Sequence, residues 1–198
     1  MLRRLLVVSL ALLTTGCGYN TIQRLDEAAQ GYQSQIEVQL QRRAELIPNL
    51  VNTVKGYAAH EEAVFTQVAN ARSGLVNAVQ SGDAEAMGTA NAALTGALGR
   101  LLAVVEAYPN LKADQSFIRL QDELTGTENR IATARGDYNN AVNAYNGYIR
   151  QFPQVITAKV TGAKPRKYFA AGPGTTEAPK VDFGTPTPPA KAPPAKTP

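Results

Sequence analysis

The chain has 198 residues, 44% of them hydrophobic, which allows one folded domain with flanking segments. Its formal net charge is +4, but residues 159–198 alone carry seven Lys or Arg against two acidic residues, and residues 5–158 are more acidic than basic. A nucleic-acid interface needs basic side chains clustered on the folded part of a protein, so this distribution argues against a nucleic-acid partner.

The N-terminal residues have the pattern of an export signal. A short basic start precedes the apolar run 5–13, which is shorter than the about 20 residues that span a bilayer. Small residues follow, and then the only cysteine, Cys17. The segment resembles the lipobox of bacterial lipoproteins, although Thr14 stands where an aliphatic residue is favoured. We therefore predict a signal peptide at 1–16 and a lipid anchor at Cys17, with an uncleaved N-terminal anchor as the alternative.

Helical periodicity begins directly after the cysteine. Apolar residues recur in steps of three and four from Tyr19 to Ile47, which predicts a first helix over this range. Pro48 has no amide hydrogen, so we expect it to end or kink this helix, or to lie in the first turn of the next one. A second helix is predicted from Asn49 to Gln80 by the same periodicity.

Two further helices follow a short polar turn. Asp83 is expected to cap a third helix that continues to Tyr108, where Pro109 stops it. Asp114 is expected to cap a fourth helix of about 39 residues that ends near Phe152, roughly 58 Å at 1.5 Å per residue. Long helices joined by short turns favour an all-α fold, an antiparallel up-and-down four-helix bundle.

The composition changes at the C-terminal end of the chain. Eight of the twelve prolines lie between Pro173 and Pro198, with Gly, Thr, Ala and Lys among them. Such a stretch buries too little apolar surface to offset the entropy of ordering it. We therefore predict a disordered Pro- and Lys-rich tail at 171–198, and assign the helical domain to 17–170.

Several short phrases in the middle of the chain have an order and spacing that chance does not explain. They are Tyr19–Asn20, Gln39–Leu40–Gln41–Arg42–Arg43, Leu46–Ile47–Pro48–Asn49–Leu50–Val51, Gly56–Tyr57–Ala58, Gly99–Arg100–Leu101–Leu102, Glu106–Ala107–Tyr108–Pro109–Asn110–Leu111–Lys112 and Glu128–Asn129–Arg130–Ile131. Together they resemble the LemA family of bacterial envelope proteins over residues 19–170. The resemblance implies a four-helix bundle on the outer, non-cytoplasmic side of a membrane. It implies no established biochemical activity, cofactor or catalytic set.

Polar residues interrupt the apolar stripes of the predicted helices. The candidates for a buried polar layer are Gln39 and Arg43 on the first helix, Arg72 on the second, Glu106 on the third, and Glu128 and Arg135 on the fourth. We expect this layer to fix the helix register, because a buried charge needs a partner and losing that partner costs about 3–5 kcal/mol. A polar pocket between the helices is the alternative interpretation.

Two Tyr-Asn pairs, at 138–139 and 145–146, repeat at a spacing of seven on the fourth helix. We expect inward tyrosines whose hydroxyls bond to Asn or to backbone groups. A groove for a partner helix is the functional alternative.

No pattern in the chain is typical of a catalytic or metal site. His60 is the only histidine and lacks the second histidine of a zinc motif, so we expect no metal. We expect no cofactor and no enzyme activity. The predicted function is that of a membrane-anchored cell-envelope protein acting on unidentified envelope proteins through protein–protein interaction or scaffolding. The alternative is an envelope sensor or enzyme that uses a polar pocket inside the bundle.

Overall fold

A computed structural model describes the backbone of residues 2–169 and the side chains of residues 18–169. Within that part of the chain every regular element is helical, which confirms the all-α class. The helices are α1 (Leu2–Lys55), α2 (Glu62–Ser81), α3 (Ala84–Val105), α4 (Pro109–Lys112), α5 (Gln115–Tyr148) and α6 (Gln154–Thr161). The predicted tail at 171–198 lies outside the described residues.

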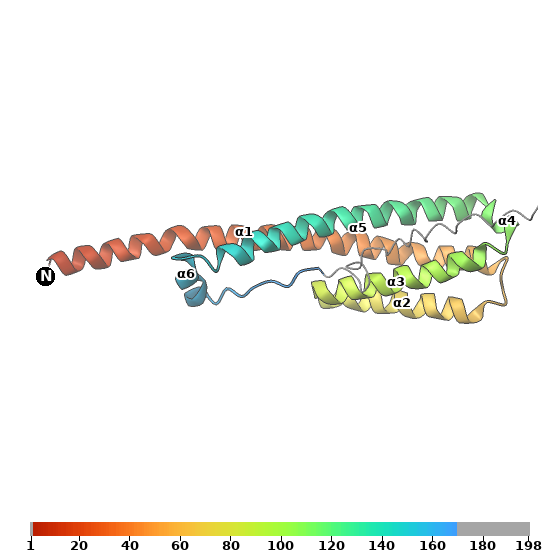
Figure 1. The fold of residues 1–198 in the computed structure, drawn as a ribbon, viewed down its shortest axis with the longest axis horizontal. Coiled ribbons are helices and arrows are strands. Elements are labelled where there is room, and N and C mark those ends of the chain that lie inside the picture. The colour runs from red at the N-terminus through yellow and green to blue at the C-terminus, as the bar shows by residue number, and fades with distance from the viewer. Residues whose placement is uncertain (1, 170–198) are drawn as a thin grey trace, which may run out of the picture.

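The long helices α1 and α5 run antiparallel and form a rod (Figure 1). The shorter helices α2 and α3 form a hairpin that lies along the half of the rod near the end of α1 (Figure 1). In this hairpin α2 packs on both α1 and α3, while α6 packs on α1. Contacts between α3 and α5 are sparse. The architecture is therefore a long helix pair with a hairpin on one side, and a space remains between α3 and α5.

Among the helices with described side chains, α3 is long and apolar enough to cross a membrane by length and composition. Nine of its residues are buried against the other helices, including Met87, Leu94 and Leu101. These core positions account for part of its apolar character.

Pro48 lies inside α1, so the predicted end of the first helix near Ile47 is wrong. Proline removes the hydrogen bond that its amide would donate to the carbonyl oxygen of Ala44, four residues earlier. The Arg72 side chain of α2 replaces that donor, with Nε 2.8 Å from the Ala44 oxygen. Ile47 and Leu50 are each 1% exposed, so packing also favours continuation of the helix through this point.

The first helix ends instead at Lys55, and a loop at 56–61 separates it from α2. The predicted second helix at 49–80 therefore consists of the end of α1, this loop and α2. Ala58 in the loop is 1% exposed and belongs to the core, so tertiary packing fixes the loop.

Aspartates cap α3 and α5, as the sequence predicts. Asp83 Oδ1 accepts hydrogen bonds from the amides of Glu85 and Ala86, at 2.9 and 3.2 Å, and Asp114 caps α5 in the same way. The Lys167 ammonium hydrogen-bonds to Asp83, and together with the amides it lowers the pKa of this carboxyl below its usual value. These caps satisfy amides that the first turn of a helix leaves free.

Residues 163–169 form an extended segment, the strap, that returns along the rod after α6 (Figure 1). Two α5 asparagines hold its main chain. Asn146 Nδ2 donates to the Arg166 carbonyl, and the Arg166 amide donates to Asn146 Oδ1, both at 2.9 Å. Asn139 makes the same pair of bonds with Phe169, at 3.3 and 2.9 Å. The predicted fourth helix to Phe152 is therefore too long, because α5 ends at Tyr148 so that the chain can turn back.

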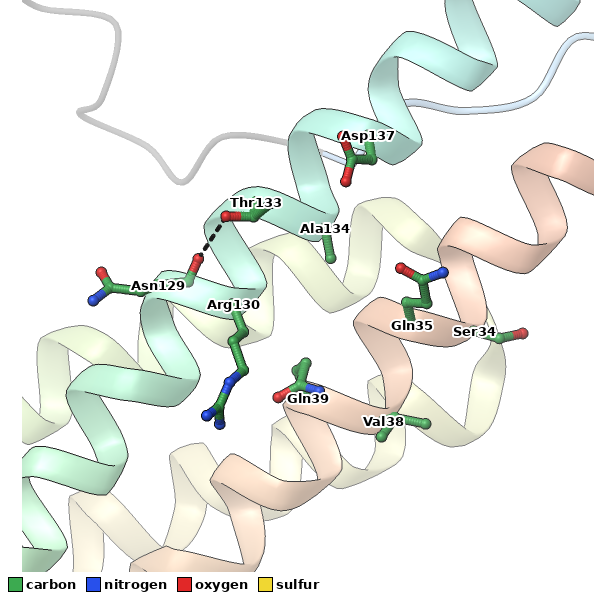
Figure 2. Close-up of a pocket in the computed structure, with 9 residues that line it drawn as sticks. All are labelled: Ser34, Gln35, Val38, Gln39, Asn129, Arg130, Thr133, Ala134 and Asp137. Carbon is green, nitrogen blue, oxygen red and sulfur yellow. Dashed lines mark hydrogen bonds between the residues drawn. The ribbon is translucent and has the colours of Figure 1, made fainter.

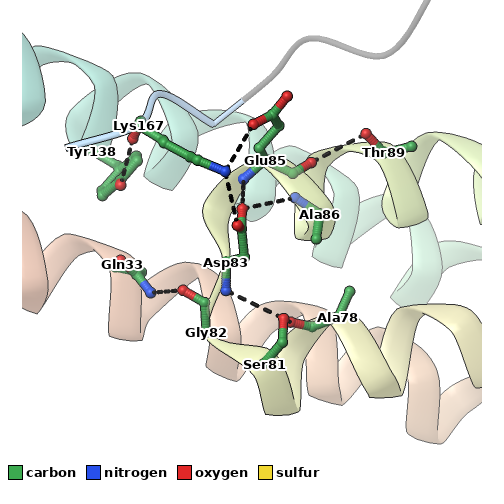
Figure 3. Close-up of polar contacts among 10 residues, drawn as sticks. All are labelled: Gln33, Ala78, Ser81, Gly82, Asp83, Glu85, Ala86, Thr89, Tyr138 and Lys167. Carbon is green, nitrogen blue, oxygen red and sulfur yellow. Dashed lines mark hydrogen bonds and ion pairs between the residues drawn. The ribbon is translucent and has the colours of Figure 1, made fainter.

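Side chains of the strap reach the other helices. The Arg166 guanidinium makes a two-point ion pair with Asp26 of α1, at 2.6 and 3.0 Å. Lys167 Nζ lies 3.0 Å from Asp83 and 3.1 Å from Glu85 at the start of α3 (Figure 3). The strap therefore joins α5 to α1 and to the hairpin.

The turn between α2 and α3 is also tied directly to α1. Gln33 Nε2 donates to the carbonyl of Gly82 at 2.8 Å, and Gly82 takes a positive φ of 67° that glycine adopts without strain (Figure 3).

Tyr138 is 2% exposed, and its hydroxyl donates to the Lys167 carbonyl at 2.8 Å. The first expectation for the Tyr-Asn repeat, an inward tyrosine bonded to a backbone group, is therefore confirmed at Tyr138.

Candidate functional site

Arg43 is the centre of the polar contacts inside the rod, with only 5% of its side chain exposed. Its Nη1 donates to Asn91 Oδ1 at 2.5 Å and to the Glu128 carboxylate, and its Nη2 donates to Thr95 Oγ1 at 3.1 Å. Burial lowers the pKa of the Arg43 guanidinium, while the charge of Glu128 and its hydrogen bond raise it. Because these partners lie on α3 and α5, one α1 side chain links three helices.

The predicted polar layer is only partly assembled around this arginine. Arg43 and Glu128 are paired, but Arg72 is held by the Ala44 carbonyl on another side of α1. The prediction that Glu106 is buried is wrong. Glu106 lies just after the end of α3, its side chain is 69% exposed, and it pairs with Lys112 at 2.7 Å.

Gln39 and Arg135 are both half-buried and do not reach Arg43. Gln39 Oε1 is buried and has no hydrogen-bond partner in the described part of the chain. Arg135 makes no ion pair with any residue between 18 and 169. The six predicted residues therefore lie in several separate places, and Gln39 belongs to the surface between α1 and α5.

Sequence reasoning missed two partners of Arg43, Asn91 and Thr95. Asn91 stands four residues after Met87 and three before Leu94, at a position where the α3 stripe calls for an apolar residue. This interruption could have identified Asn91. Thr95 follows it by one helical turn and gives no comparable signal.

A cleft of about 310 Å³ lies next to this cluster, between α3 and α5. Arg43 and Leu50 of α1 line it, together with Leu98 and Leu102 of α3 and Leu124 of α5. The polar residues at its edge are Gln121, Thr125, Glu128 and Asn129 of α5 and Thr95 of α3. The cleft is thus apolar at one end and carries an ion pair at the other.

A groove runs along the opposite face of the helix pair, between α1 and α5 (Figure 2). One hollow of this groove, of about 600 Å³, is lined by Ser34, Gln35, Val38 and Gln39 of α1 and by Asn129, Arg130, Thr133, Ala134 and Asp137 of α5. A second hollow of about 620 Å³ shares Val38 and continues along α1 to Asn49. In Figure 2 the α2–α3 hairpin lies behind these two helices, so the groove is on the face that the hairpin leaves uncovered.

Among the side chains of residues 18–169, no group of three His, Cys, Asp or Glu is arranged to hold a metal ion. His60 is exposed in the loop between α1 and α2. The side chain of Cys17 lies outside the described part.

Comparison with known proteins gives a family and a set of relatives. The chain matches the LemA family over residues 32–183. It is 33% identical over 178 residues to Magnetosome protein MamQ 1 and to Magnetosome protein MamQ 2 of Paramagnetospirillum magneticum AMB-1, with 78% of this chain and 65% of each relative covered. It is 32% identical over 174 residues to Magnetosome protein MamQ of Magnetospirillum gryphiswaldense, with 76% and 64% covered.

The family match begins at residue 32, within α1, and ends at residue 183, whereas the resemblance in the sequence extends from 19 to 170. The chain spans slightly less than two thirds of the length of these relatives. The match includes Arg43, Glu128, both strap asparagines and every helix from α2 onward. This chain is a member of the LemA family.

Proposed function

We propose that this protein is a membrane-anchored cell-envelope protein that acts as a scaffold, binding another envelope protein through the groove between α1 and α5. LemA family membership and the similarity to magnetosome proteins support a place in a membrane-associated envelope setting. No catalytic step is part of the proposal. The rod holds a recognition surface at a defined distance from its N-terminal anchor.

The observation that carries this proposal is the groove itself. Its two hollows follow α1 from Ser34 to Asn49, which is about 22 Å at 1.5 Å per residue. Val38 lies where the two hollows meet and is 62% exposed, unusually open for an apolar side chain at the centre of a depression. Gln39 Oε1 lies beside it without a hydrogen-bond partner in the described chain. A ligand that covers Val38 would bury this apolar side chain, and a donor on the same ligand would give Gln39 Oε1 its missing hydrogen bond.

An amphipathic α-helix of another protein is the occupant that fits this geometry. Each wall of the 600 Å³ hollow is one helical ridge with residues spaced by three and four, and a helix places side chains in such a groove at the same spacing. Charges of both signs border the groove, with Arg130 and Asp137 at one hollow and Arg42 and Glu123 at the other. We therefore expect a helix with a narrow apolar stripe and mixed charges on its flanks.

The membrane attachment is a separate part of the proposal. We propose that Cys17 carries the lipid anchor and that residues 1–16 are removed, because the signal-like flanks precede this single thiol. Intact-mass analysis of protein extracted from membranes should show the mature chain with added lipid, and Cys17→Ser should keep the leader and gain no lipid. A lipid mass that persists in Cys17→Ser, or a native chain that retains residues 1–16, would contradict this assignment.

Site-specific photocrosslinking in cells tests the groove. A photoreactive phenylalanine analogue at Val38 of the full chain should capture one protein reproducibly, because this position lies at the centre of the groove. Thr133→Trp, which fills the facing wall, should reduce that capture by roughly tenfold, the change expected when about 1.4 kcal/mol of binding is lost. The mass spectrum of the adduct should place the crosslink within a helical segment of the captured protein.

The matched control is Val160 of α6, an 83% exposed valine far from the groove in sequence and fold. A label at Val160 should not capture the same protein. Equal capture from Val160, or capture from Val38 that Thr133→Trp leaves unchanged, would show that the groove is not the recognition surface. Repeating the Val38 experiment in a chain ending at Ala171 separates recognition by the helices from recognition by the tail.

The alternative function, an envelope sensor, has one observation in its favour. The α3–α5 cleft combines an apolar interior with the Arg43–Glu128 ion pair, the arrangement typical of small-molecule sites.

A further inference from the structure

We propose that the cleft between α3 and α5 binds a small uncharged amphipathic molecule, whose aliphatic part packs on the cleft leucines and whose carbonyl oxygen accepts a hydrogen bond from Arg43. This site opens between α3 and α5 and shares only Asn129 with the residues that line the α1–α5 groove. Its ligand chemistry therefore does not depend on the scaffold proposal, and either can fail without the other.

The shape of the cleft follows from how the helices pack. The helix α3 is held by α2, and α5 by α1, with few contacts between α3 and α5 themselves. Leu50 of α1 lines this space on the α1 side and is 1% exposed. The remaining volume of about 310 Å³ is at the lower end of the range of small-molecule pockets, roughly 300–1,000 Å³. The cleft therefore has room for a short aliphatic chain with one polar group.

The apolar part of the ligand is specified by the walls. Leu98 of α3 is 7% exposed, whereas Leu102 of α3 and Leu124 of α5 are half-buried although they belong to the edge of the core. These three side chains face the cleft. An aliphatic chain between them would remove apolar surface from water on both walls.

The polar part is specified by Arg43. A guanidinium has five N–H donors, and the described residues accept three hydrogen bonds from this one, through Asn91, Glu128 and Thr95. Among the described residues Nε has no acceptor, but it is fully buried and out of reach of the cleft. Nη2 has one hydrogen that no described residue accepts, so Nη2 is the donor left for a ligand. Arg43, Thr95 and Glu128 all line the cleft, so we infer that the ligand carbonyl accepts from Arg43 Nη2 at this polar end.

The charge of the ligand follows from Glu128. This carboxylate already neutralises Arg43, so a ligand carboxylate would place a second negative charge beside it. A ligand ammonium group would instead be repelled by the positive charge of the Arg43 guanidinium. A neutral amide or ketone oxygen avoids both repulsions and supplies the missing acceptor.

Two glycines of α3 provide a blocking variant and its control. An added Cβ meets nothing within 4 Å at Gly99 or at Gly96, so both positions accept a larger side chain. Gly99 lines the cleft and Gly96 does not. A helical side chain leans toward the preceding turn, so a leucine in place of Gly99 would lie over the Thr95 end of the cleft. Both replacements remove a glycine from a helix interior and should preserve or raise the melting temperature.

The experiment is a titration of the full chain in lipid nanodiscs with hexanamide, followed by the NMR signals of ¹³C-labelled leucine methyl groups. We expect saturable shifts at Leu98, Leu102 and Leu124. Gly99→Leu should weaken binding by roughly tenfold or more, and Gly96→Leu by less than about twofold. Thr125→Trp blocks the cleft from its exposed α5 side and should weaken hexanamide binding to the same extent. It serves as the blocking variant if Gly99→Leu alters the fold.

Hexanoate and hexylamine test the charge of the ligand. Each should bind at least roughly fivefold more weakly than hexanamide, because each carries a charge into an already neutral ion pair. Tighter binding of hexanoate would overturn the assignment of an uncharged ligand. An absence of saturable shifts at the three leucines, or binding that neither blocking variant reduces, would overturn the site.

Discussion

Glu128→Ala is expected to destabilise the protein by about 2–3 kcal/mol, because it leaves the Arg43 guanidinium buried without its carboxylate. Removing one partner of a fully buried ion pair costs about 3–5 kcal/mol, and the 43% exposure of the Glu128 side chain reduces this figure because water can enter the vacated space. Urea unfolding of the full chain in nanodiscs, followed by helical circular dichroism, measures the loss.

The control for this prediction is a glutamate-to-alanine substitution at Glu123, five residues earlier on α5. Glu123→Ala removes an exposed ion pair with Arg42, whose nitrogen and oxygen lie 3.8 Å apart, and should change the free energy of unfolding by less than about 0.5 kcal/mol. Adding Arg43→Met to Glu128→Ala should recover at least roughly 1 kcal/mol, because the unpaired charge is then gone. Equal losses in Glu123→Ala and Glu128→Ala would mean that Arg43 does not depend on its carboxylate.

Asn139→Ala combined with Asn146→Ala is expected to release the strap from α5. Together the two side chains make four hydrogen bonds to the main chain of Arg166 and Phe169, each contributing about 0.5–1.5 kcal/mol. The local free energy of opening should fall by about 2–4 kcal/mol. Trypsin cleavage after Arg166 and Lys167 should then accelerate by roughly tenfold or more, together with hydrogen exchange of the Arg166 amide.

Asn143→Ala is the matched control for the strap. Asn143 lies on α5 between the two strap asparagines, and its Oδ1 accepts only a long hydrogen bond, 3.5 Å, from the exposed Tyr168 hydroxyl. This variant should be cleaved at the same rate as the native chain. If the double variant is cleaved no faster than Asn143→Ala, the ion pair of Arg166 with Asp26 holds the strap by itself.

The sequence was sufficient where a local signal decided the structure. The aspartates that begin α3 and α5 were predicted because a carboxylate bonded to two free amides needs only neighbouring residues. Arg43 and Glu128 were identified because each interrupts an apolar stripe. Tyr138 was expected to point inward, but its partner, the Lys167 carbonyl, is 29 residues away and could not be identified from spacing.

The sequence was insufficient at Pro48 and at Glu106. Pro48 is a helix breaker by local rules, yet α1 continues through it because Arg72 of α2 supplies the donor that proline lacks. Glu106 follows an apolar run and was predicted to be buried, but α3 ends one residue before it and turns it toward Lys112. At Pro48 the deciding contact depends on how the helices pack, whereas at Glu106 the position of the helix end decides, since Lys112 is only six residues away.

The unbroken course of α1 has a mechanical consequence for the whole protein. Between Tyr19 and Lys55 the helix rises about 54 Å at 1.5 Å per residue, and α5, the strap and Arg72 brace it along the way. With the anchor that we propose at Cys17, this helix would act as a lever arm that pivots at its N-terminal end. A tilt of α1 by about ten degrees at its N-terminal end would move the loop at 56–61 by roughly 9 Å. This displacement is about as large as the diameter of a helix.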